Sequence, residues 1–271
     1  TYSSGGIPSI RCKILNCRAV NSVWAGVIAQ QCTPWSELAG NTVERSGQGV
    51  MAGSRNSRIT GNTVRTHLPF STDYYYTRIA RGGTVGVAVF EGYARDCEIR
   101  GNRVENFYTG IAVLDGYEEL NVFDRVDAVI ADNTVRNCIH GFYHYRNSYN
   151  TARSAMYVTL SGNVLNGAGD SVLAGGEQRK TYGIRISDRC GEYAIRSNAT
   201  NGFRYGAALG RMPDLIALDA NHFSDGRYGI FLDDLSGTGE NGEIRLHDSD
   251  NTFSSIQTPR QGLDQACVKN Y

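Results

Sequence analysis

Two acidic residues occupy the same place in consecutive copies of one short sequence pattern. Glu91 and Asp115 each lie five residues after a glycine, Gly86 or Gly110, that opens a segment of alternating apolar residues. If these segments are neighbouring strands of one sheet, the two carboxylates face each other at about 5 Å. That separation is typical of the pair that cleaves a glycosidic bond with retention, and mutual repulsion raises one pKa so that this group serves as a general acid. Asp115 and Glu91 are therefore the predicted catalytic residues.

Other residues at equivalent places define alternative chemistries. Asp188 and Asp234 lie two copies apart, about 10 Å, close to the upper limit for an inverting carboxylate pair. A lyase or an epimerase instead needs a base beside a uronate carboxylate and a cation for the charge that develops. The residues of suitable type are Tyr143, Tyr145, Arg146 and Arg185. For each acidic residue taken alone, a solvated turn carboxylate is the simpler interpretation, because turns favour Asp.

The elements that must position these groups are set by an internal repeat. An asparagine recurs after a short apolar-alternating segment, and Cys17 holds its place in an earlier copy. The recurring residues are Asn41, Asn62, Asn102, Asn133, Asn163, Asn198, Asn221 and Asn251. In five copies a glycine follows eight residues later, as from Asn41 to Gly49. A fixed register of this kind is typical of a repeat architecture.

Each copy is interpreted as three short strands in a coil of roughly 22 residues, which buries its apolar face only by stacking on the next coil with parallel pairing. Parallel crossovers are right-handed in nearly all cases. We therefore predict an all-β fold, a right-handed parallel β-helix of about nine coils and three sheets with an interior asparagine ladder. The whole chain, 1–271, is expected to be one domain and a fragment or mature portion of a longer chain. An antiparallel sandwich is disfavoured, because its hairpins would not repeat the eight-residue offset.

Insertions between coils predict a groove on the sheet of glycine-opened strands. Residues 67–83 lengthen one coil, and longer returns follow Gly110, Gly141 and Gly229, so both rims of this sheet carry loops. Alternation directs residues such as Ile111 inward, and His144 is expected to pack inside. It leaves Ala88, Ala112, Tyr143, Arg185 and Phe231 outward, where the small side chains permit close approach of a ligand. Further predicted binding residues are Tyr75, Tyr117, Glu118, Asp188, Asp233 and Asp234.

The recurring G-N-x-V and Y-G-I elements, over roughly residues 10 to 258, resemble the pectin-lyase-like right-handed β-helices. This group includes polysaccharide lyases, glycoside hydrolases, epimerases and phage tailspike depolymerases. The resemblance implies that the glycine-opened strands form the first sheet, where such proteins commonly hold a sugar groove. The signature motifs of the individual families are missing from this sequence, so the resemblance does not indicate one particular activity.

The expected function is that of a carbohydrate-active protein that binds and cleaves an extended polysaccharide, neutral or acidic, as a hydrolase or a lyase. Two alternatives stay open: a non-catalytic glycan-binding or adhesive solenoid, and a uronan C5-epimerase. The expected location is extracellular, periplasmic or virion-associated, and the expected assembly is a monomer or a homotrimer.

Composition limits the other partners. The 27 basic and 27 acidic side chains balance, and no apolar run approaches the length of a membrane span, so neither nucleic acid nor a membrane is expected. No histidine pair has metal-ligand spacing and no cofactor is expected, although the DGYEE loop at 115–119 is a conceivable Ca²⁺ ligand set. The seven cysteines show no CxxC spacing and are expected to be small buried residues.

Overall fold

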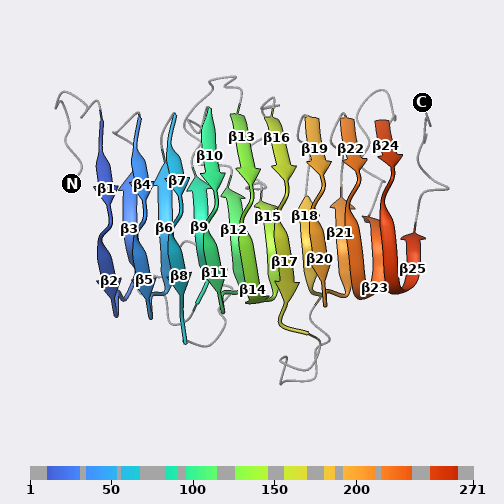
Figure 1. The fold of residues 1–271 in the computed structure, drawn as a ribbon, viewed down its shortest axis with the longest axis horizontal. Helices are drawn as coiled ribbons and strands as arrows, with labels where there is room; N and C mark the ends of the chain where they lie inside the picture. Colours follow the sequence, from blue (N-terminus) through green and yellow to red (C-terminus); the bar gives the residue numbers. More distant parts are fainter. Residues whose placement is uncertain are drawn as a thin grey trace.

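The computed structural model describes residues 11–30, 35–53, 56–67, 83–90, 96–114, 126–145, 156–169, 180–186, 192–210, 215–233 and 245–261. These residues form a solenoid in which strands far apart in the sequence lie side by side, from β1 (Lys13–Leu15) at one end to β24 (Arg245–Ser249) near the other (Figure 1). Neighbouring coils pair in parallel, as the repeat predicted. Within the described ranges, no helix is long and apolar enough to cross a membrane.

The first face of the solenoid is a nine-stranded sheet, so the predicted nine coils are confirmed. Between β1 and β24 it contains β4 (Glu37–Ala39), β7 (Arg58–Thr60), β10 (Cys97–Arg100), β13 (Val126–Ala131), β16 (Met156–Ser161), β19 (Glu192–Arg196) and β22 (Leu215–Asp219).

The second face follows a sharp corner in each coil. Its strands are β2 (Arg18–Val20), β5 (Thr42–Glu44), β8 (Thr63–Arg65), β11 (Arg103–Glu105), β14 (Thr134–Cys138), β17 (Val164–Gly167), β20 (Ala199–Asn201) and the first parts of β23 (His222–Asp233) and β25 (Thr252–Gln261).

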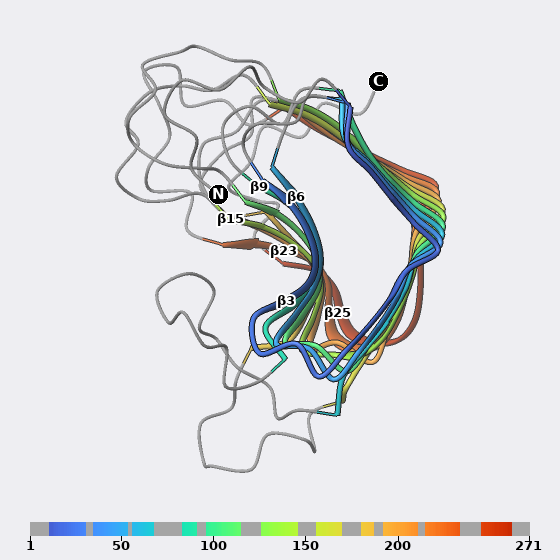
Figure 2. The same ribbon diagram turned by 90° about the vertical axis from the view of Figure 1, so that its left-hand side faces the viewer.

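The third face contains the glycine-opened strands. These are β3 (Ala25–Gln30), β6 (Gln48–Gly53), β9 (Val85–Phe90), β12 (Thr109–Leu114), β15 (His140–Tyr145), β18 (Tyr182–Ile186) and β21 (Tyr205–Gly210), followed by the later parts of β23 and β25. Viewed along the axis, this face bows towards the core, so that its outer side is concave (Figure 2). Because β23 runs unbroken through the corner and pairs with both β20 and β21, the second and third faces share one 16-stranded sheet. The three predicted faces are thus joined as two sheets.

The corner between the first and second faces explains the Gly-Asn pairs of the sequence. The residue before each ladder position has a positive φ in every coil, and four of these nine residues are glycines. They are Asn16, Gly40, Gly61, Gly101, Asp132, Gly162, Ser197, Ala220 and Asp250. Glycine adopts this conformation without steric cost, and Asn and Asp tolerate it better than other residues.

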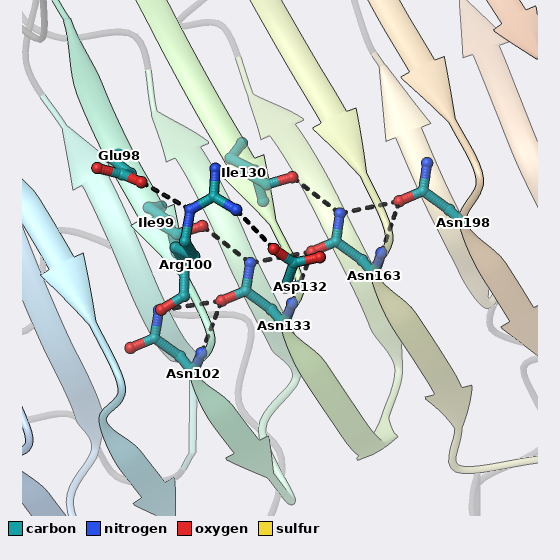
Figure 3. A network of polar contacts seen from close by, with 9 residues as sticks. All are labelled: Glu98, Ile99, Arg100, Asn102, Ile130, Asp132, Asn133, Asn163 and Asn198. Carbon is teal, nitrogen blue, oxygen red and sulfur yellow. Dashed lines mark hydrogen bonds and ion pairs between the residues drawn. The ribbon is translucent and has the colours of Figure 1, made fainter.

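The asparagine ladder is present and fully buried along most of its length (Figure 3). Asn133 Oδ1 accepts hydrogen bonds from the backbone N–H (2.9 Å) and from Nδ2 (3.0 Å) of Asn102, and Asn133 Nδ2 donates to the carbonyl of Ile99 (2.9 Å) and to Oδ1 of Asn163 (2.9 Å). The same pattern runs from Asn41 to Asn251. Each buried amide is therefore satisfied internally, as predicted.

The interior is one continuous apolar core that includes Ile111 and Ile184. At the corner between the second and third faces the glycine is required by packing, because a Cβ on Gly110 would overlap the Val135 side chain of the second face. The residue before the glycine points outward and the residue after it points into the core: Tyr182 belongs to an outer cluster, whereas Ile184 belongs to the core. Strict alternation therefore breaks at this glycine.

Candidate functional site

The outer side of the third face carries two columns of side chains in register from coil to coil. The first column, at the residue before each glycine, contains Val85, Thr109, His140, Tyr182, Tyr205 and Tyr228. The second, two residues after the glycine, contains Met51, Ala88, Ala112, Tyr143, Arg185, Ala208 and Phe231. Small and aliphatic residues predominate from β6 to β12, and aromatic or cationic residues predominate from β15 to β23.

The aliphatic end of this face is closed. Met51, Val85, Ala88 and Ala112 form a small apolar cluster separate from the main core, and all four are buried. The expectation that Ala88 and Ala112 leave room for a ligand is therefore wrong, because atoms that are already covered in the free protein offer no contact surface.

The aromatic end is a continuous set of ring contacts, which we call the aromatic cluster: His140, Tyr143, Tyr182, Tyr205, Tyr228 and Phe231. The Tyr205 ring stacks between those of Tyr182 and Tyr228, each at a centroid distance of 5.1 Å, and meets Phe231 edge-on at 4.9 Å. Tyr182 and Tyr205 are buried, whereas Tyr143, Tyr228 and Phe231 are partly exposed. The accessible rings are thus held in place by buried ones, and such edge and offset contacts contribute about 0.5–1.5 kcal/mol per pair.

Arg185 lies over the aromatic cluster. Its guanidinium carbon is 4.4 Å from the ring centroid of Tyr182 and 5.3 Å from that of Tyr143, the residue paired with Arg185 across β15 and β18. Arg204 lies over Tyr205 and Arg227 lies over Tyr228 in the same way, at 5.8 Å and 5.1 Å. Cation–π contacts of this kind hold each guanidinium against a ring face.

His140 is a buried polar residue of the cluster. The side chain is 3% exposed and touches the rings of Tyr108, Tyr143 and Tyr182. Burial, with a further contribution from the Arg185 charge, lowers the pKa of His140 to about 3. The imidazole is therefore neutral near pH 7, and its buried Nδ1 has no hydrogen-bond partner among the described residues.

Of the predicted site residues, the structure brings together Tyr143 and Arg185. Tyr145 and Asp233 are the last residues of β15 and β23, where they pair in register with Leu114 and Gly210. The remaining predicted residues lie outside the described ranges: Glu91, Asp115, Arg146, Asp188, Asp234, Tyr75, Tyr117 and Glu118. Phe90 and Leu114, which directly precede Glu91 and Asp115, pair with each other, which is the register that the catalytic prediction assumed.

Sequence reasoning missed the first outer column. Tyr182, Tyr205 and Tyr228 each precede the glycine of their coil, and alternation counted from Ile184 directs that position inward. The break at the glycine turns it outward instead. The recurring Tyr-Gly pair was the signal that could have identified a stacked tyrosine column.

Two expectations about buried residues are settled by the core. His144 is completely buried, and its Nδ1 lies 2.7 Å from the hydroxyl of Tyr193, so the inward prediction is confirmed. Cys97 and Cys138 are buried, and burial raises the pKa of each thiol to about 12. Cys17 is exposed at the start of the ladder, so the expectation of buried cysteines is wrong there.

Within the described ranges, no group of three or more His, Cys, Asp or Glu side chains is arranged to hold a metal ion.

Comparison with known proteins supports the fold. Searches of curated proteins and of solved structures gave no match. The family model described as "right handed beta helix region" matches residues 2–200, which is more than half of the chain. With its nine parallel coils and continuous asparagine ladder, the chain belongs to this right-handed β-helix family.

Proposed function

We propose that this β-helix binds an extended polysaccharide along the outer side of its third face, over β15, β18, β21 and β23. The observation that carries the proposal is the aromatic cluster, whose partly exposed Tyr143, Tyr228 and Phe231 contact the buried rings of His140 and Tyr205, with Arg185 over Tyr143. Pre-positioned aromatic rings provide a large contact area at a small entropic cost, and a few polar groups among them fix orientation.

The arrangement suits a chain-like ligand better than a compact one. The outer columns repeat once per coil along the solenoid axis, so equivalent contacts recur at about 4.8 Å. The concave outer side of the third face runs in the same direction (Figure 2). A polymer lying parallel to the axis would meet one set of contacts from each coil.

Cleavage of the polysaccharide is the further part of the proposal and depends on Asp115 and Glu91. If the protein is a hydrolase, Asp115→Asn should reduce turnover at least about a hundredfold, the low end for loss of a general acid or base, and should leave binding intact. A lyase would yield unsaturated products that absorb in the ultraviolet, an epimerase would change stereochemistry without shortening the chain, and a binding solenoid would leave the polymer unchanged. Full activity of both Asp115→Asn and Glu91→Gln would exclude this pair.

The binding proposal is tested by truncating the accessible rings. Tyr143→Ala and Phe231→Ala should each weaken the affinity for a bound polysaccharide at least about tenfold, because central aromatic contacts carry much of the energy of an interface. Trp24→Ala is the matched control, since Trp24 is also exposed but lies in the first coil, away from the cluster. A panel of plant, bacterial and algal polysaccharides in affinity electrophoresis provides the measurement. Equal affinities for all four proteins would contradict the proposal.

A further inference from the structure

Most cations on the first and second faces have surroundings that differ from those of Arg185. They pair with carboxylates of the same coil or of a neighbouring coil, or they are exposed to solvent. The pairs on these faces include Lys13 with Glu37, Arg18 and Arg65 with Glu44, Arg58 with Glu98, and Arg100 with Glu98 and Asp132. Arg103 has no such partner among the described residues, but it is exposed to solvent on the second face.

Arg185 has neither a paired carboxylate among the described residues nor full exposure to solvent. It is only partly exposed, it rests on two tyrosine rings, and no carboxylate of the described residues pairs with it. The neighbouring His140 is buried and neutral near pH 7 and contributes no negative charge. A partly desolvated guanidinium without a counter-charge is costly unless a ligand supplies one.

The neighbouring coils add to the positive character of this position. Arg204 and Arg227 occupy equivalent positions on adjacent coils, one residue before the paired Tyr205 and Tyr228, and stack on those rings. Like charges in adjacent strands repel each other. Two cations on adjacent coils, each stacked on a tyrosine ring, suit an anionic ligand.

We infer that Arg185, Tyr143 and His140 form an anion-binding subsite that takes one carboxylate or sulfate group of the bound glycan. Arg185 provides the planar fork that pairs with two oxygens of such a group. The Tyr143 ring holds that fork. His140, whose ring contacts that of Tyr143, has a buried Nδ1 without a hydrogen-bond partner among the described residues, and in the tautomer that carries the proton on Nδ1 it donates to the same anion. The inference rests on the proposed function, since it specifies the chemistry of a ligand that binds the same face.

The geometry favours an acidic glycan over a nucleic acid. Affinity for a phosphate backbone comes from many basic contacts along a charged stripe. Here three arginines lie on three successive coils, with Arg185 at a different position in its coil from Arg204 and Arg227, and each stacks on a tyrosine ring. The acidic and basic side chains of the whole chain balance at 27 each. A glycan that carries one acid group every few sugar units matches this spacing of charge.

The test compares matched polymers that differ only in acid groups: dextran against dextran sulfate, and carboxyl-reduced polygalacturonate against polygalacturonate. Wild type should bind at least one acidic member at least about tenfold more tightly than its neutral partner, with an affinity that falls as salt rises. Arg185→Gln should remove this preference, Arg185→Lys should keep part of it, and Arg103→Gln should keep all of it. Thermal midpoints show whether each variant is folded.

The outcomes separate the two claims. If Arg185→Gln keeps the wild-type preference, or if wild type binds neutral and acidic members equally while Tyr143→Ala weakens both, the anion subsite is refuted and glycan binding stands. If no polysaccharide binds, both the anion subsite and the proposed function are refuted. Tighter binding of single-stranded oligothymidylate than of any glycan would overturn both.

Discussion

Residue chemistry differs sharply between the interior and the outer third face. Inside, each ladder asparagine satisfies both backbone and side-chain groups of its neighbours, and on the outside of the first face Arg100 bridges Glu98 and Asp132 between coils (Figure 3). On the third face, Arg185 stacks on rings and His140 retains an unsatisfied nitrogen. The ladder amides, which serve folding, are thus fully paired, whereas the His140 nitrogen that we assign to binding is not.

The ladder predicts a large stability loss from a single amide deletion. Asn102→Ala removes the acceptor of the Asn62 backbone N–H (2.9 Å) and the donor to the Ile59 carbonyl (2.8 Å), both in the buried interior. Each buried group left without a hydrogen-bond partner costs about 1–3 kcal/mol, so we expect the free energy of unfolding to fall by at least about 3 kcal/mol in urea titrations. Arg103→Ala, at the next and exposed position, should change it by less than about 0.5 kcal/mol. Similar small effects of both variants would contradict the ladder energetics.

His140 predicts a specific loss of stability in mild acid. Its pKa is about 3 in the folded protein and about 6.5 when unfolded, so between these values the unfolded chain binds the additional proton. Stability from this residue is therefore complete above about pH 6.5 and falls as pH decreases towards 3, by about 2 kcal/mol between pH 6.5 and pH 5. His140→Gln should lose less stability over that interval than wild type in urea titrations at the two pH values. An identical loss would show that His140 does not titrate in this way.

At the scale of the strand and corner, the repeat predicted most of the fold. The Asn and Gly positions gave the coil length, the parallel stacking and the ladder, because both residue types answer needs that recur in every coil: a buried amide at one corner and a missing Cβ at another. The outer first column was missed because Gly183 and its equivalents interrupt the alternation of side chains. Pairings that depend on ring contacts, such as Tyr182 with Tyr205, leave no spacing rule in the sequence beyond the repeated Tyr-Gly.

The first corner predicts a stabilising substitution. Ala220 has a φ of 52° where four other coils carry glycine, and the left-handed conformation costs a non-glycine residue about 1–2 kcal/mol. Ala220→Gly should therefore raise the free energy of unfolding by about 0.5–1 kcal/mol after the additional backbone entropy of glycine is subtracted. Ala217→Gly, in the regular strand β22, should lower it instead. The pair is compared by thermal and urea unfolding, and a loss of stability in both variants would refute the conformational argument.

At the scale of the whole molecule, a solenoid connects only neighbouring coils, so its two ends can serve different purposes. The third face is apolar and closed from β6 to β12 and aromatic and cationic from β15 to β23. The sequence predicted a ligand on this same face but centred it nearer the N-terminal coils, over β9 to β18. The aromatic cluster moves the proposed site towards the C-terminal coils, because the burial of Ala88 and Ala112 closes the other end.

The most direct test of glycan binding on this face is a crystal structure of the protein with an acidic oligosaccharide of about six sugar units. We predict that the sugar chain lies along the solenoid axis on the outer side of β15, β18, β21 and β23, with an acid group within hydrogen-bonding distance of Arg185 and sugar rings against Tyr143 and Phe231. An oligosaccharide bound to the first or second face, with the aromatic cluster left uncovered, would contradict the account.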